Sequence, residues 1–262
     1  MNCHKTLLRR VLPTLLLILS ATSYAQIGDG QVRVAMENAV NKTVDDLRLS
    51  EDYAWVARKA IREILLSKEM TALILKISKE SKIESQSYLE QVGANIMTTT
   101  REKAVLRLSR QDLYRLVILN SKVASVMNDY ECAQFYRKRR TDETGKGRSI
   151  YKIAANLDLK SFEEYLNLFT KAFLLFTSEV DESEKFTKSE IDSIKEEYAE
   201  KFSDLIEKKP FIADFFQSGK TFAKASDSEV CRIGKSLSEL VVSGDKWSAQ
   251  RRNAAFVQGL LF

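Results

Sequence analysis

Residues 187–210 read TKSEIDSIKEEYAEKFSDLIEKKP, a stretch that carries the start, body and end of one helix. Thr187 and Glu190 have the spacing of a capping box, in which a hydroxyl accepts a free backbone N–H and the glutamate reaches back. Pro210 ends the segment because proline cannot continue a helix. The apolar residues between recur every three or four positions and form one stripe: Ile191, Ile194, Tyr198, Phe202, Leu205 and Ile206. The stretch therefore predicts an amphipathic helix over 188–208.

The same pattern recurs through most of the chain. Ser161 with Glu164, and Ser226 with Glu229, predict two more capping boxes, and Ser50 precedes a further helix start. A wide apolar surface between 113 and 130 predicts a central helix that is buried on most sides. The predicted helices span 31–47, 51–66, 69–79, 84–107, 110–139, 149–156, 161–177, 188–208, 211–217, 227–242 and 246–260.

Composition supports an all-α fold. The chain has only 9 glycines and 2 prolines, while 29% of its residues are charged. We therefore expect a multi-helix bundle of about 9–11 helices. Residues 26–262 are long enough to bury one core as a single all-α domain. The loop at 141–148 marks two possible halves, 26–140 and 149–262.

The N-terminus has the three parts of an export signal. Lys5, Arg9 and Arg10 precede a short apolar run at 11–19, and small residues, Ser23 and Ala25, precede a cleavage point after Ala25. We expect a signal peptide at 1–25 and a periplasmic or secreted, soluble product with no membrane span; a retained anchor is the alternative. Cleavage leaves 38 basic and 36 acidic residues, so the basic character of the precursor says little about partners.

Cleavage would also leave two cysteines, Cys132 and Cys231. Two thiols in an oxidising compartment predict one inter-helix disulfide that joins the two halves. Two separately buried thiols are the alternative.

Histidine is missing from the predicted product, because the single histidine, His4, lies in the signal. Catalysis by Ser-His-Asp or Cys-His groups is thereby excluded, as are the usual zinc hydrolase sites. We predict no metal site, no cofactor and no enzymatic activity. A nucleic-acid partner is also not expected, because no sustained basic face with interleaved aromatic residues is present.

One basic cluster is the candidate binding site. Its expected contact is an acidic protein partner or an anionic membrane surface. The alternative is that these cations are solvated and complement a helix C-terminus. The cluster consists of Arg137, Lys138, Arg139, Arg140, Lys146 and Arg148.

Two other functions stay open. A carboxylate-dependent enzyme that cleaves peptidoglycan or another glycan needs no histidine. Residues 83–85 and 93–97 resemble part of the lytic transglycosylase motif, in which a glutamate precedes a serine; its later glutamine is missing here and the spacing is too short. Glu84 is the acid such an enzyme would use. A carrier of apolar ligands would instead place Phe169, Phe173 and Phe176 around a cavity.

The leading expectation is a non-catalytic binding protein of the cell envelope. An immunity or inhibitor protein, or an accessory subunit of an envelope complex, would fit it. Its partner would be another envelope or periplasmic protein.

Overall fold

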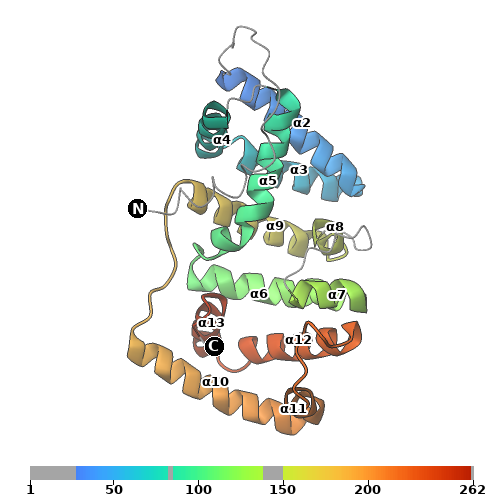
Figure 1. Cartoon of the computed structure of the whole chain (residues 1–262), viewed down its shortest axis with the longest axis vertical. Helices are drawn as coiled ribbons and strands as arrows, with labels where there is room; N and C mark the ends of the chain where they lie inside the picture. The colour runs from blue at the N-terminus through green and yellow to red at the C-terminus, as the bar shows by residue number, and fades with distance from the viewer. Residues whose placement is uncertain (1–27, 82–84, 138–149, 261–262) are drawn as a thin grey trace.

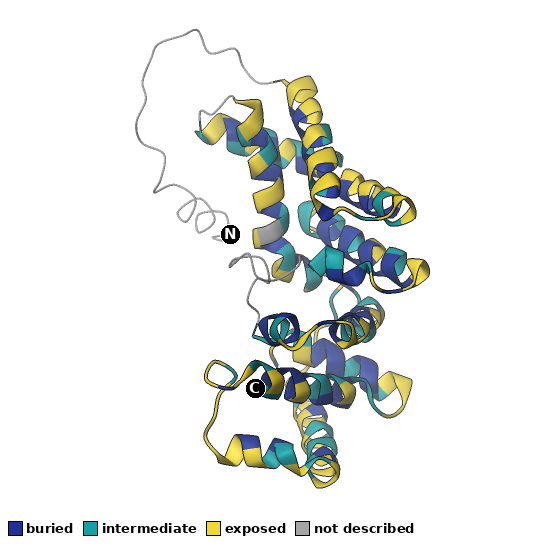
Figure 2. Ribbon diagram, turned by 90° about the vertical axis from the view of Figure 1, so that its right-hand side faces the viewer, coloured by how far each residue is buried: buried dark blue, intermediate teal, exposed yellow. Residues whose placement is uncertain are grey.

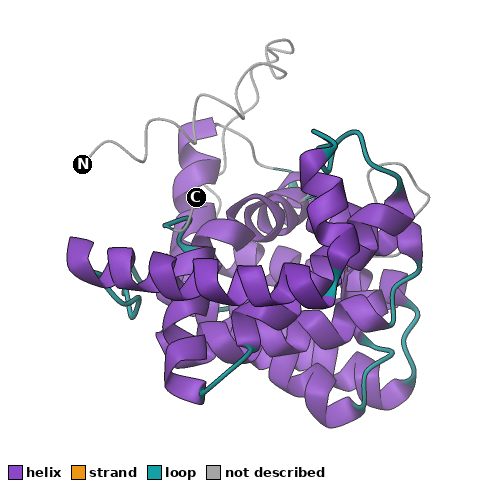
Figure 3. Cartoon of the chain, turned by 90° about the horizontal axis from the view of Figure 1, so that it is seen from below, coloured by secondary structure: helices purple, strands orange, loops and turns teal. Residues whose placement is uncertain are grey.

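The computed structural model describes residues 28–81, 85–137 and 150–260, which form twelve helices and no strand (Figures 1 and 3). The predicted all-α bundle is confirmed. The helices are α2 (Asp29–Leu47), α3 (Glu51–Leu65), α4 (Lys68–Ser81), α5 (Gln86–Val105), α6 (Arg110–Ser125), α7 (Asp129–Tyr136), α8 (Ile150–Ala154), α9 (Leu159–Thr177), α10 (Lys188–Lys208), α11 (Pro210–Gln217), α12 (Asp227–Val242) and α13 (Lys246–Val257).

The helices stack into an elongated body. Figure 1 shows α2 to α5 at one end, α9 and α8 below them, α6 and α7 across the middle, and α10 to α13 at the other end. Figure 2 shows that the buried sides of the helices face one another within this stack. Helix α9 contacts α3 and α5, while α6 contacts α12 and α13, and α7 contacts α12. Helices from both sides of the 141–148 segment therefore pack together.

Helix α9 supplies the centre of the largest core. Phe162, Tyr165, Phe169 and Phe173 recur every three or four residues and are all buried. This spacing places them on one face of α9, and α9 packs against α3 and α5. Arg101 donates a hydrogen bond to the Tyr165 hydroxyl over 3.1 Å, so the one polar atom of this aromatic row is satisfied.

Helices α7 and α12 are joined by the predicted disulfide. Cys132 and Cys231 are bonded, with their Cα atoms 5.2 Å apart, and both are buried. Gly234 allows this close approach, because a Cβ there would lie 2.3 Å from carbon atoms of the Tyr136 ring. The Tyr136 hydroxyl lies 3.0 Å from Ser238 Oγ. Helices α7 and α12 are thus held together by the disulfide, by the packing of the Tyr136 ring on Gly234 and by the Tyr136–Ser238 hydrogen bond.

The single helix predicted over 110–139 is wrong. Helix α6 ends at Ser125, and α7 begins at Asp129 after a short break. Asn128 Oδ1 accepts the N–H of Glu131 over 2.9 Å, and Asn128 N–H donates to Glu131 over 3.3 Å. Apolar residues continue at helical spacing through Val126 and Met127, so the spacing alone does not reveal the break between the two helices. The other predicted helices are confirmed, with ends that differ by a few residues.

The capping box predicted at Ser161 is also wrong. Helix α9 starts earlier, at Leu159, because Asp158 Oδ1 accepts the N–H of Ser161 over 2.9 Å. A carboxylate is a strong N-cap acceptor, and hydrogen bonds from Ser161 hold the pKa of Asp158 below its usual value. Glu164 instead forms an ion pair with Arg115, 3.1 Å between Oε1 and Nε.

The other two predicted capping boxes, at Thr187 and Ser226, are confirmed. In the second, Glu229 accepts hydrogen bonds from Lys220 Nζ over 2.8 Å and from the Ser226 N–H over 3.0 Å. The bond from Lys220 and then those from Ser226 lower the pKa of Glu229 to about 2. Ser226 Oγ in turn accepts the N–H of Glu229 over 3.3 Å, so two backbone donors are satisfied at the start of the helix that carries Cys231.

This cap predicts a pH dependence of stability. Because the pKa of Glu229 is lower in the folded chain, its contribution is fully present above the ordinary glutamate pKa near 4.5 and is lost as the pH falls toward 2. We expect the free energy of unfolding to fall less over this range in Glu229→Gln than in the wild type. Urea unfolding at several pH values measures the difference. Parallel curves for the two proteins would show that the cap adds no pH-dependent stability.

None of the helices in the described ranges is both long enough and apolar enough to cross a membrane.

Candidate binding trough on helix α3

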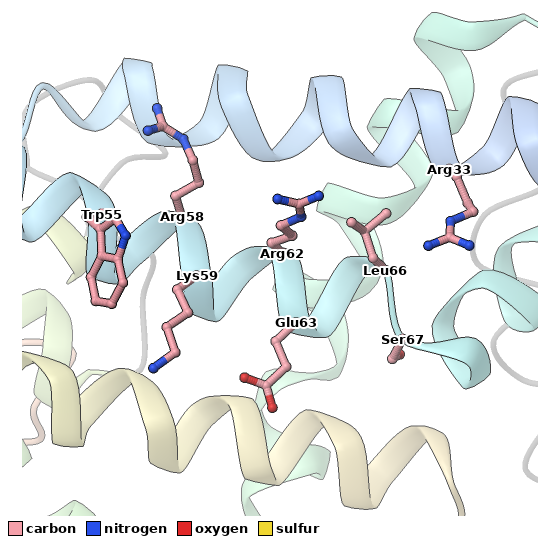
Figure 4. A pocket seen from close by; sticks show the side chains of 8 residues that line it. All are labelled: Arg33, Trp55, Arg58, Lys59, Arg62, Glu63, Leu66 and Ser67. Atoms are coloured by element: carbon pink, nitrogen blue, oxygen red, sulfur yellow. The ribbon is translucent and has the colours of Figure 1, made fainter.

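An open trough of about 520 Å³ runs along the outer face of α3 (Figure 4). Seven of its eight lining residues come from α3 and the turn that follows it, and the eighth comes from α2. The lining residues are Arg33, Trp55, Arg58, Lys59, Arg62, Glu63, Leu66 and Ser67.

The sequence of α3 explains why this face turns away from the core. Its apolar residues recur at helical spacing and turn inward: Val56, Ala57, Ala60, Ile61, Ile64 and Leu65 are all buried. The remaining side chains must lie on the opposite, outer face. Helix α3 starts at Glu51 after Ser50, as predicted, although the Ser50 side chain makes no capping hydrogen bond. The trough thus has a rigid floor, because the helix beneath it is packed into the main core.

The three trough cations that belong to α3 point to two sides of the helix. Arg58 and Arg62 point toward α2, whereas Lys59 points toward α9 (Figure 4). Arg62 pairs with Glu37 at 2.6 Å, and Arg58 pairs with Asp45 at 3.5 Å. Lys59 lies 3.9 Å from Glu163 of α9. All these side chains are substantially exposed, so the ion pairs contribute little stability and leave the cations accessible from solvent.

Trp55 is the apolar part of the site. Its side chain is 61% exposed, although tryptophan is usually largely buried. The Lys59 ammonium lies 5.5 Å from the centre of its ring. Trp247 is exposed to a similar degree, 59%, but there the Arg110 guanidinium stacks on the ring at 3.8 Å and is held by Glu184. Trp55 therefore offers an apolar surface at the edge of a groove.

A second open pocket of about 560 Å³ adjoins the trough at Glu63, which lines both. It lies mainly along α9, and Lys171 is its one cation. Hydrogen bonds from Lys171 to Glu182 and Asp112 raise the pKa of the lysine. Lys171 is thus held by two carboxylates, 2.6 Å and 2.9 Å away.

The basic cluster predicted from the sequence lies elsewhere. Of its six residues, only Arg137 falls within the described residues; Lys138, Arg139, Arg140, Lys146 and Arg148 lie outside them. Arg137 is turned inward, with its side chain 8% exposed, and its guanidinium binds three groups before and at the start of α12. It donates to the carbonyl oxygens of Phe222 and Ala225, each over 2.7 Å, and to Asp227 over 2.5 Å. Arg137 therefore links the end of α7 to the start of α12, and we call these three hydrogen bonds the Arg137 clamp.

The residues considered for other functions are placed as follows. Glu84 lies outside the described residues. Phe169 and Phe173 are buried in the main core and Phe176 packs against it; none of the three lines either pocket described here. In the part of the chain that the structure describes, no group of three or more His, Cys, Asp or Glu side chains is arranged to hold a metal ion.

Sequence reasoning missed the trough. Trp55 stands in the apolar run 53–57, which reads as a core segment. The position of each residue around the helix axis could have revealed it. Val56, Ala57, Ala60 and Ile61 share the buried face, whereas Trp55 lies on the opposite face with Arg58 and Lys59. That distinction follows from helix geometry, but only the tertiary structure shows that, among the described residues, no other helix covers Trp55.

Comparison with known proteins adds no assignment, because no protein-family model matches the chain and neither curated proteins nor solved structures include a match to it.

Proposed function

We propose that the protein is exported, loses residues 1–25 and acts without catalysis by binding another envelope or periplasmic protein. An immunity or inhibitor protein and an accessory subunit of an envelope complex are the two roles that this proposal covers. The disulfide supports export, because such bonds persist in oxidising compartments and are rare in the cytosol.

The exposed ring of Trp55 beside the arginines of α3 carries the proposal. Tryptophan and arginine are among the residues most enriched at the energetic centres of protein interfaces. Here they lie together on a helix whose other face is buried, so binding costs little conformational entropy of the backbone. Three of the eight lining residues are arginines, and Trp55 is 61% exposed. That combination favours a surface that a protein partner covers.

Affinity capture from envelope extract tests this function. The bait is the tagged mature chain, compared with Trp55→Ala and with the matched control Trp247→Ala, which removes an equally exposed tryptophan from another surface. We expect one stoichiometric protein to be retained by the wild type and the control. Affinity of the purified pair should fall about thirtyfold or more in Trp55→Ala, as for an interface hot spot.

Two results would contradict the proposal. The first is a captured protein that binds Trp55→Ala as tightly as the wild type. The second is recovery of peptidoglycan fragments without a stoichiometric protein, which would favour a glycan-cleaving or glycan-binding role. Circular dichroism of each variant verifies that the fold is unchanged.

A further inference from the structure

The trough has a regular spacing that restricts what can fill it. Trp55, Arg58, Arg62 and Leu66 follow one another at intervals of three, four and four residues, so they share one row along α3. At 1.5 Å per residue the row is about 16 Å long, or three helical turns. Its ends are apolar, with Trp55 exposed and Leu66, the residue after α3, half-buried against the core; its two central side chains are guanidinium groups.

The charge of the lining favours an acidic occupant. Four cations and one carboxylate line the trough. Arg58 and Arg62 already face Asp45 and Glu37, and Lys59 lies near Glu163. All three pairs are exposed and therefore weak. A guanidinium has five N–H donors, so each arginine can bind a second carboxylate without releasing the first.

The backbone of α3 favours a helix over an extended peptide. A bound strand gains most of its affinity from main-chain hydrogen bonds to the edge of a sheet. The N–H and C=O groups in the middle of α3 are already paired within the helix, so they offer no such edge. A second helix laid along α3 presents side chains every three or four residues, which is the spacing of the row.

A glycan fits the lining less well. Its neutral hydroxyl groups need both donors and acceptors, whereas arginine and lysine side chains only donate. Among the eight lining side chains, acceptor oxygens are present on Glu63 and Ser67 alone.

We propose that the trough binds an acidic amphipathic helix of the partner protein. Two carboxylates one turn apart lie against Arg58 and Arg62, and an apolar side chain at each end covers Trp55 and Leu66. This inference rests on the proposed function and specifies the chemistry of the same surface.

Selection from a peptide display library tests the inference without knowledge of the partner. Helix-forming peptides of about 16 residues, long enough for four turns, are selected on the immobilised mature protein. The variant Arg58→Gln/Arg62→Gln serves for counter-selection. The enriched peptides should carry two Asp or Glu residues four positions apart between apolar residues. A fluorescein-labelled copy of a selected peptide should bind Arg58→Gln/Arg62→Gln at least about tenfold more weakly than the wild type. Replacing the two acidic residues of the peptide by Gln should weaken binding to the wild type by a similar factor.

The matched control is Lys188→Gln/Lys195→Gln, which removes two exposed cations from α10 at the other end of the molecule. It should bind the labelled peptide like the wild type. Enrichment of neutral or basic peptides, acidic peptides that bind the arginine variant equally well, or no enrichment at all would overturn the inference. So would peptidoglycan fragments that bind the wild type but not the variant.

Failure of this inference is distinguishable from failure of the proposed function. A captured protein that depends on Trp55 but contacts the trough through a segment without carboxylates would overturn the inference alone. The absence of any protein whose capture depends on Trp55 would overturn the proposed function.

Discussion

Reduction of the Cys132–Cys231 disulfide is expected to lower the melting temperature of the mature protein by roughly 10–20 °C. The bond spans 99 residues of sequence, so in the unfolded chain it closes a very long loop. Chain entropy assigns about 4–5 kcal/mol to such a crosslink, and a protein of this size loses about 2–4 °C per kcal/mol. Calorimetry with and without reducing agent measures the shift.

The double variant Cys132→Ala/Cys231→Ala provides the control for this experiment. It should melt near the reduced wild type and should not respond to reducing agent. Equal melting of the oxidised and reduced wild type, together with free alkylation of both thiols, would show that the crosslink does not hold the fold together.

Replacing Arg137 by methionine is expected to lower the free energy of unfolding by about 2–4 kcal/mol. The side chain is nearly buried and donates to two carbonyl oxygens and to Asp227. Methionine retains most of the volume but none of the donors, so the carbonyl oxygens of Phe222 and Ala225 lose these partners. Urea unfolding gives the change as a lower midpoint with an unchanged slope.

Arg137→Lys is the matched variant, because it keeps the charge without the planar fork that reaches three acceptors. Its stability should lie between those of the wild type and Arg137→Met. A loss below about 1 kcal/mol in Arg137→Met would contradict the clamp. A test of the basic cluster as a partner contact should therefore change Arg139 and Arg140 and leave Arg137 in place.

Local features of the structure follow from the sequence more completely than long-range features do. The caps at Thr187 and Ser226 are local, because each needs only a hydroxyl and a glutamate three residues later, and both are confirmed. Asn128 shows the limit of periodicity. Its cap separates α6 from α7, while the apolar spacing on either side continues as if the helix were unbroken.

The disulfide partners followed from counting, since only two cysteines remain after the predicted cleavage. Arg137 did not follow from any pattern. In sequence it begins a basic run, but Phe222, Ala225 and Asp227 lie about 90 residues away and approach it only when α7 packs on α12. A residue that looks like a surface charge thereby becomes a nearly buried hydrogen-bond donor.

Helix type, most helix ends and the pair of bonded cysteines were determined by the sequence alone, because propensity, capping and apolar period act within a few residues. The exposure of Trp55 and the burial of Arg137 were decided only by the tertiary structure. Both depend on which helix covers which face, and that is set by contacts between residues far apart in the chain.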